Sequence, residues 1–331
     1  MSKNIDKVIE KIRDEMGQDI IVEVNKERVD VPAISTGSFS LDIALGVGGV
    51  PKGRVVEIFG QESTGKTTLA LNIAREGQKE KRVAFIDAEN ALDLEYARNI
   101  GVDTDNLIIS QPDSAEQGLQ LLEKLVKSNE FSVIIIDSVA AMSPRAEIEG
   151  EIGDATIGLQ ARLMSSALRK LSKPISESGT VVVFLNQVRQ KIGGYGSSEV
   201  TSGGLALKFY CSVRINLRKG GRLKSKDVEI GERIKATVVK NKVAPPFRTA
   251  EYDVYYGEGI SRSADILNAA VKVKLVKKSG AWLSYGEAKG AGFEGLKKIL
   301  DKDPELLEEI RLKVLEIIQN GKKEKNREAT D

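Results

Sequence analysis

A glycine-rich segment that directly follows an apolar run constrains the fold of this chain more than any other feature. The apolar run, residues 55–59, predicts a strand, and residues 66–79 have the pattern of a helix. Between them the chain reads Gly60-Gln61-Glu62-Ser63-Thr64-Gly65-Lys66-Thr67, a complete match to G-x-x-x-x-G-K-S/T. In this order, backbone N–H groups and the positive helix end point toward a phosphate. We therefore expect a nucleotide site in which Lys66 reaches the β and γ phosphates and the Thr67 hydroxyl ligates Mg²⁺. The alternative, a glycine-rich turn that holds Lys-Thr by chance, leaves the flanking strand and helix unexplained.

The segments around this loop alternate between apolar runs and helical patterns. Further strands are expected at 83–86, 107–109, 133–136 and 181–185, and further helices at 115–127 and about 158–176. Such alternation is typical of a parallel sheet with helices on both faces. Beyond residue 209 three strands are expected without helices, at 210–217, 233–240 and 251–256, which predicts an antiparallel extension.

The two ends of the chain have patterns of their own. Helical spacing predicts a helix over 3–16, which packs either on its own domain or on a neighbouring subunit. Three further helices, at 264–271, 294–301 and 305–319, surround a short hairpin at 282–285. We therefore divide the chain into an N-terminal helix and linker (1–30), an α/β core (31–259), a small α/β C-terminal domain (260–320) and a disordered tail (321–331).

Composition limits the chemistry that the site can perform. The 331 residues include no histidine, which excludes Ser-His and Cys-His nucleophilic pairs and leaves carboxylates, lysines and bound water. Asp137 follows the strand 133–136 at the edge where open α/β sheets bind ligands, so we expect it beside the metal; a helix cap is the alternative. Glu89 follows another strand and is a candidate general base, with a solvated loop carboxylate as an equally supported alternative.

Charge and cysteine content bear on partners and compartment. The net charge of +2 gives no overall field toward nucleic acid or membranes. The single cysteine, Cys211, stands in an apolar, strand-like run and is expected in the core, and one cysteine fits a reducing compartment. Because the N-terminus has no apolar signal core and no stretch reaches the length of a membrane span, we expect a cytoplasmic protein.

Several motifs together resemble those of bacterial RecA recombinases, in order and spacing, from about residue 5 to 318. They are Gly60–Thr68, Ala84–Glu89, Ile135–Ala141, Arg145–Asp154, Leu185–Arg189, Gly203-Gly204, Lys208–Tyr210 and Val239–Phe247. The resemblance implies a RecA-like P-loop core with an N-terminal arm. It also implies an ATP- and Mg²⁺-dependent recombinase that polymerises on single-stranded DNA, pairs it with homologous duplex and exchanges strands, with hydrolysis driving release.

The same resemblance assigns roles to individual residues. The phosphate loop extends through Thr68, and Asp93 and Tyr96 contact the adenine. Glu89 activates the attacking water, and Gln187 senses the γ-phosphate. Lys240 and Lys242 reach ATP on the adjacent subunit, and a co-protease role toward an SOS repressor is also implied.

Two segments are expected to contact DNA. Residues 188–202 form a long loop with basic, glycine and aromatic residues that suit phosphates and bases; the alternative is a flexible surface loop. Its candidates, with a following glycine pair, are Arg189, Lys191, Ile192, Gly193, Gly194, Tyr195, Gly203 and Gly204. Residues 149–157 are acidic, which by charge argues against DNA contact, yet the resemblance makes them the first DNA loop. Its candidate contacts are Ile157, Arg162 and Arg169.

The sequence departs from the family pattern at several positions, and two alternative functions remain open. Asn90 and Thr156 replace frequent histidines, Tyr195 replaces a commoner Phe in a loop that is one residue shorter, and the strongly acidic tail is absent. One alternative function is a RecA-fold ATPase of helicase or regulatory type that takes no part in strand exchange. The other is a filament or DNA-coating protein without catalysis.

Overall fold

The computed structural model describes residues 2–16, 31–151, 158–190, 199–225 and 228–328, which divide into two units, Met1–Val31 and Pro32–Asp331. The first unit contains helix α1 (Ser2–Met16), as its apolar spacing predicts. The side chains of Ile5 and Val8 on this helix are exposed. Helix α1 by itself therefore has an apolar stripe that it does not bury.

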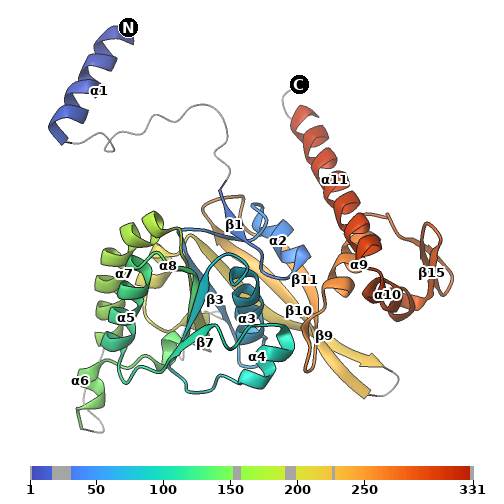
Figure 1. Cartoon of the computed structure of the whole chain (residues 1–331), viewed down its shortest axis with the longest axis horizontal. Helices are drawn as coiled ribbons and strands as arrows, with labels where there is room; N and C mark the ends of the chain where they lie inside the picture. Colours follow the sequence, from blue (N-terminus) through green and yellow to red (C-terminus); the bar gives the residue numbers. More distant parts are fainter. Residues whose placement is uncertain (1, 17–30, 152–157, 191–198, 226–227, 329–331) are drawn as a thin grey trace. The chain divides into compact units, whose positions relative to one another are not determined.

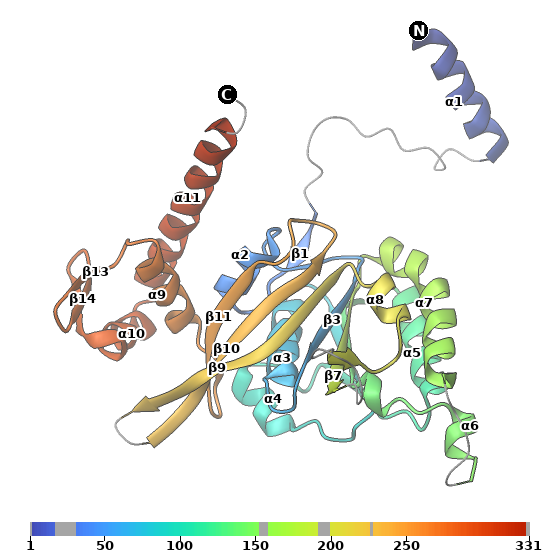
Figure 2. The same cartoon turned by 180° about the vertical axis from the view of Figure 1, so that it is seen from behind.

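A large, mostly parallel sheet forms the centre of the second unit (Figures 1 and 2). Its parallel strands are β3 (Val55–Gly60), β4 (Arg82–Asp87), β5 (Leu107–Ser110), β6 (Phe131–Asp137) and β7 (Val181–Gln190). They run in the order β3-β7-β6-β4-β5, so the predicted α/β class is confirmed. Parallel strands bring their carboxyl ends to one edge, where Gly60, Asp87 and Asp137 stand.

On the other side of β3 the sheet becomes antiparallel, as the consecutive strands predict. Strand β9 (Val213–Ser225) runs parallel to β3, and β10 (Val228–Asn241), β11 (Thr249–Tyr255) and β12 (Gly259–Ile260) follow in antiparallel order. Strands β9 and β10 are longer than expected because they continue as a ribbon beyond the sheet.

Helices cover both faces of the sheet. One face carries α3 (Lys66–Gly77), α4 (Leu94–Ile100) and α2 (Phe39–Leu45), whose short neighbours β1 (Ala33–Ile34) and β2 (Val50–Pro51) pair with each other. The other face carries α5 (Ala115–Lys127), α7 (Leu159–Ser178) and α8 (Ala206–Tyr210). The short turns η2 (Val139–Ala141) and α6 (Arg145–Ile148) follow β6.

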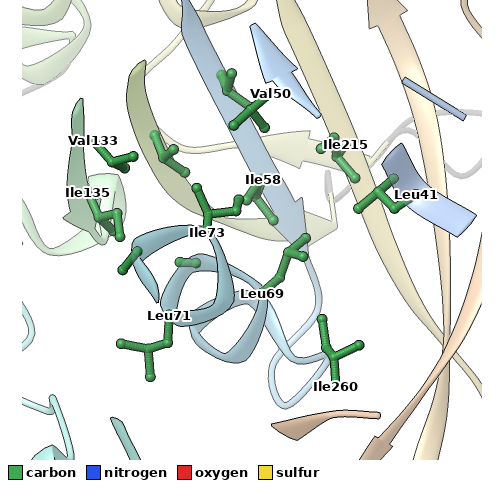
Figure 3. Close-up of a cluster of buried hydrophobic side chains, with 14 of the residues drawn as sticks. Leu41, Val50, Ile58, Leu69, Leu71, Ile73, Val133, Ile135, Ile215 and Ile260 are labelled. Atoms are coloured by element: carbon green, nitrogen blue, oxygen red, sulfur yellow. The ribbon is translucent and has the colours of Figure 1, made fainter. Parts of the chain in front are cut away.

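Alternating strand residues divide the core into two layers. Ile135 packs with Leu69 and Ile73 of α3 on one face (Figure 3), while its neighbours Ile134 and Ile136 pack with α5 and α7 on the other. Because both faces are buried, the central strands read as continuous apolar runs.

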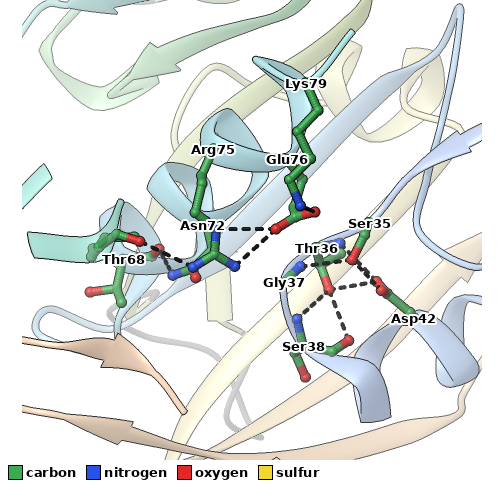
Figure 4. A network of polar contacts seen from close by, with 11 residues as sticks. Ser35, Thr36, Gly37, Ser38, Asp42, Thr68, Asn72, Arg75, Glu76 and Lys79 are labelled. Atoms are coloured by element: carbon green, nitrogen blue, oxygen red, sulfur yellow. Dashed lines mark hydrogen bonds and ion pairs between the residues drawn. The ribbon is translucent and has the colours of Figure 1, made fainter. Parts of the chain in front are cut away.

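Polar contacts fix the start of α2 (Figure 4). The Asp42 carboxylate accepts hydrogen bonds from the Ser35 hydroxyl and from the backbone N–H and hydroxyl of Thr36. Burial raises the pKa of Asp42 to about 7 despite these bonds. The first turn of α2 is therefore tied to the segment that precedes it.

The C-terminal domain contains α9 (Arg262–Lys272), β13 (Lys277–Ser279), β14 (Trp282–Tyr285), β15 (Ala288–Ala291), α10 (Gly292–Lys302) and α11 (Pro304–Glu328). Its buried Asp265 accepts hydrogen bonds from the hydroxyls of Ser38 and Ser40, at the start of α2. This contact joins the domain to the core.

Three sequence expectations differ from the structure. Residues 206–210 form α8, so the strand expected from residue 210 begins only at Val213, and the buried Cys211 follows the helix. The loop expected at 188–202 is partly a ribbon, because β7 continues to Gln190 and pairs with β8 (Glu199–Thr201). Helix α11 continues to Glu328, so the tail expected to be disordered is helical over 321–328.

Candidate functional site

The phosphate loop connects the end of β3 to the first turn of α3. Ser63 and Gly65 adopt left-handed φ values of 56° and 79°, and the Thr64 hydroxyl donates to the Gln61 carbonyl at 2.8 Å. A Cβ at Gly60 would lie 2.4 Å from the Leu217 carbonyl oxygen, so β9 packs too closely there for any other residue. The loop is thus curled as a cradle for an anion at the N-terminus of α3.

The Lys66 ammonium lies inside this cradle. Its Nζ donates to the carbonyls of Gly60 at 3.3 Å and Gln61 at 2.8 Å. Burial lowers the pKa of Lys66, and the charges of Asp137, Glu89 and Glu62 oppose that change. Because the hydrogen-bond partners of this ammonium are neutral carbonyls, its charge is available to a phosphate.

A hydroxyl and a carboxylate stand side by side next to the cradle. The Thr67 hydroxyl donates to Asp137 Oδ2 at 2.9 Å. Burial raises the pKa of Asp137 to about 6, and the charges of Glu89 and Asp87 add to this effect. A hard divalent cation would favour the ionised carboxylate, so these oxygens fit Mg²⁺. Among the described residues there is no cluster of three or more acidic or cysteine side chains that could hold a metal ion.

The side chain of Glu89 is exposed, and it accepts hydrogen bonds from side chains at the ends of two neighbouring strands. Gln187 Nε2 donates to Glu89 Oε1 at 3.1 Å, and the Ser138 hydroxyl donates to the same oxygen. The loop that carries Glu89 is fixed by the buried Asp87, which accepts from the backbone N–H groups of Ala91 and Leu92. The structure therefore brings Glu89 and Gln187 to the same sheet edge as the phosphate loop.

Asp93 and Tyr96 lie on the adjacent helix α4. Asp93 is its N-cap and accepts from the Tyr96 backbone N–H at 3.0 Å. The Tyr96 hydroxyl lies 2.9 Å from that of Thr68, in the first turn of α3. The two predicted adenine contacts are thus next to the helix that begins at the phosphate loop.

Lys240 and Lys242 are not brought to this site. In the sheet register Gly60 pairs with Leu217, whereas Lys240 pairs with Arg214, three residues or about 10 Å nearer the opposite edge. Lys240 Nζ donates to the carbonyls of Lys208 at 2.5 Å and Phe209 at 3.0 Å, and Lys242 is exposed. Burial lowers the pKa of Lys240, with Lys242 as a second cause.

The structure describes some of the candidate DNA contacts. Arg162 and Arg169 are exposed on α7, and the backbone of Arg189 pairs with Val200 in the ribbon. Gly203 and Gly204 have left-handed φ, and a Cβ on them would lie 2.8 Å from Val139 Cγ1 and 2.7 Å from Ala161 Cβ. Close packing therefore requires both glycines whether or not they meet DNA. Outside the described residues lie Ile157, Lys191, Ile192, Gly193, Gly194 and Tyr195.

Other residues at or near the site were not predicted from the sequence. Ser138 carries no pattern of its own, but Glu57 does, since it is a lone charge within the apolar run 55–59. It is fully buried and bonded to Asn186 and Arg214. A charge in a buried strand is a signal that could have found this group.

Comparison with known proteins matches both parts of the chain. The RecA N-terminal domain family matches residues 3–261, and the RecA C-terminal domain family matches 264–319. A Protein RecA from Sulfurovum is 54% identical over 96% of this chain and 93% of its own length. Those from Geobacter metallireducens and Helicobacter pylori are 55% and 53% identical, over 95% and 96% of this chain and 94% and 90% of their own lengths.

None of the helices within the described residues has the length and apolar character needed to cross a bilayer.

The family matches do not favour a helicase-type or regulatory ATPase, because they cover both domains of a recombination protein. The chain is a member of the RecA family, the ATP- and DNA-binding proteins of homologous recombination and DNA repair.

Proposed function

We propose that this chain hydrolyses ATP in a filament on single-stranded DNA and uses that cycle to form and release recombination complexes. The observation that carries the proposal is the contact of Glu89 with Gln187, at the same sheet edge as a phosphate loop that holds the Lys66 ammonium. A carboxylate for the water and an amide for the γ-phosphate are what hydrolysis needs when histidine is absent.

The nucleotide would lie along the start of α3. The N–H groups of residues 60–68 cradle the phosphates, and Lys66 exchanges its carbonyl partners for the β and γ oxygens. Tyr96 stacks on the adenine, and Asp93 accepts from its amino group. The hydroxyl contact between Tyr96 and Thr68 supports this placement, since it joins the base contact to the phosphate loop.

The metal-side residues are Thr67, as a ligand, and Asp137, through its carboxylate. When bound there, Mg²⁺ neutralises charge on the phosphates. The raised pKa of Asp137 supports this role, because a carboxylate whose charge is disfavoured gains from a cation.

The water that attacks the γ-phosphate would lose its proton to Glu89. Gln187 donates to Glu89 and can turn that donor to the γ-phosphate, so nucleotide state is passed to the ribbon that begins on the same strand. Lys240 and Lys242 would act on the ATP of the adjacent subunit. Their position toward the opposite edge of the sheet from their own phosphate loop supports a role across an interface.

Filament formation would use surfaces that a single chain leaves open. Helix α1 has exposed Ile5 and Val8, and β5 is an edge strand whose Ile108 and Ile109 are 39% and 38% exposed. An apolar arm on one copy and an apolar strand edge on another are complementary.

DNA would lie along the glycine-rich segment 188–204 and the first loop at 149–157, next to Arg162 and Arg169. The acidic charges of the first loop leave backbone N–H groups and these arginines as its means of contact. Sequence comparison is done by base pairing between strands, so the protein needs no base-edge contacts. We further propose cytoplasmic function and a co-protease role toward an SOS repressor, which rest on family membership alone.

The test is ATP hydrolysis measured while single-stranded DNA is titrated. We expect turnover to rise with DNA and to saturate. Turnover that DNA leaves unchanged would reject the proposal.

The interface role of Lys240 is tested by mixing the Lys240→Ala and Lys66→Ala variants and measuring ATP turnover, because each variant supplies the group that the other lacks. Partial recovery of turnover in the mixture is expected, and no recovery would place Lys240 outside the neighbour's site.

A further inference from the structure

A fully buried carboxylate stands in the middle of β3, the strand that leads into the phosphate loop. Glu57 is 0% exposed and accepts hydrogen bonds from Arg214 Nε, on β9, and from Asn186 Nδ2 at 2.9 Å, on β7. The Arg214 guanidinium also lies over the Phe59 ring, 4.5 Å from its centroid. A buried charge is tolerated when it is paired and hydrogen-bonded, and Glu57 meets both conditions.

Both the nitrogen and the oxygen of the Asn186 side-chain amide make hydrogen bonds. Its Nδ2 also donates to the Ser202 carbonyl at 2.9 Å, and its Oδ1 accepts from the Gln187 backbone N–H at 2.9 Å. The Glu57 carboxylate accepts from Asn186, so the NH₂ end of the amide faces it. The Glu57 carboxylate, the Ser202 carbonyl and the Gln187 N–H thus all require the same orientation of this amide, so the three contacts depend on one another.

Those two contacts belong to different parts of the recombinase. Gln187 donates to Glu89 at the nucleotide site. Ser202 directly follows β8, the strand that closes the DNA-loop ribbon against β7. Within the described residues the buried hydroxyls of Thr201 and Ser202 have no hydrogen-bond partner, so this segment has polar groups left to pair in a second arrangement.

We propose that Glu57 is a positioning residue that, held by Arg214, orients Asn186 so that Gln187 and the end of the DNA loop at Ser202 respond together to the nucleotide. This inference rests on the proposed function, because it assumes that Gln187 reads the γ-phosphate. The bonded chain runs from β9 through β3 to β7, so a shift of Gln187 is transmitted to Ser202 through one amide. Neither Glu57 nor Asn186 needs to touch ATP or DNA.

The experiment measures the coupling between nucleotide and DNA rather than activity alone. The coupling factor is the Kd for a labelled poly-dT oligonucleotide without nucleotide, divided by the Kd with a non-hydrolysable ATP analogue. Such factors are typically about 5- to 150-fold. The analogue's own Kd, without DNA, is measured in parallel.

Three variants separate positioning from stability. Asn186→Ala removes the amide. The double variant Glu57→Met with Arg214→Met replaces the ion pair by apolar side chains of similar length, an exchange that buried pairs often tolerate without loss of stability. Thr180→Val is the control, because it removes a buried hydrogen bond to the Phe131 carbonyl just before β7, far from Asn186 along the strand.

We expect Asn186→Ala and the double variant to lower the coupling factor about tenfold, with the analogue's own Kd within about twofold of the wild type. Thr180→Val should leave the factor unchanged. The inference is overturned if both network variants keep the wild-type factor, or if the control loses it equally. A wild-type protein without nucleotide-dependent DNA binding would instead refute the proposed function, and the inference with it.

Discussion

At the scale of single residues, the position of Glu89 decides what the site can do. One of its oxygens accepts from both Ser138 and Gln187, so two donors orient the carboxylate. Its exposure leaves room for a water molecule, and the loop behind it is fixed by the buried Asp87. An oriented, accessible carboxylate is a suitable general base.

The corresponding prediction concerns Glu89→Gln. The amide has the same shape but cannot take a proton from water, so kcat for DNA-stimulated ATP hydrolysis should fall about 10²- to 10⁴-fold. ATP binding, measured by equilibrium titration with a fluorescent analogue, should stay close to the wild type because Lys66 and Thr67 are unchanged. Turnover that survives this substitution would remove Glu89 from the role of base.

At the scale of elements, local sequence patterns predicted the buried strands. They missed helix α8 and the contacts of Glu57, which depend on tertiary packing. The strands that lead to Gly60, Glu89 and Asp137 are buried on both faces, and continuous apolar runs in the sequence predict such strands. Helix α8 was missed because residues 206–210 serve a tertiary contact, with Leu207 buried against the sheet. The hydrogen bonds of Glu57 to β7 and β9 join residues more than a hundred positions apart, which no local pattern contains.

The contact between α2 and the segment that precedes it carries a prediction about pH, through Asp42. Burial raises the folded-state pKa of Asp42 to about 7, above the unfolded value of about 3.9. Its contribution to stability is therefore complete below about pH 4 and is lost as the pH rises through about 7. The free energy of unfolding in urea should fall between pH 5 and 7 by up to about 1.4 kcal/mol per pH unit from this group alone.

The matched variant for that measurement is Asp42→Asn, which cannot ionise. Between pH 5 and 7 its free energy of unfolding should change less steeply than that of the wild type, since all other groups are shared. Parallel profiles for the two proteins would show that Asp42 does not titrate in this range.

At the scale of the whole molecule, the open surfaces predict assembly. Ile5→Glu with Val8→Glu puts charge on the apolar stripe of α1 and should abolish filaments on single-stranded DNA, as judged by electron microscopy with an ATP analogue. The fold of the core and nucleotide binding should be retained. Leu312→Glu is the control, because Leu312 is an exposed apolar residue of α11 that the proposed interface does not use. Filaments that persist in the α1 variant, or that are lost equally in the control, would contradict the proposed role of this helix.

Strand exchange between circular single-stranded DNA and homologous linear duplex tests the central claim most directly, because it requires filament, nucleotide and both DNA partners at once. With ATP and Mg²⁺ the wild-type protein should convert the substrates to nicked circular duplex and a displaced linear strand. Without ATP, or with Lys66→Ala, no such product should form. Product that forms equally well without ATP, or no product despite DNA-stimulated ATP hydrolysis, would contradict the account of this chain as an ATP-driven recombinase.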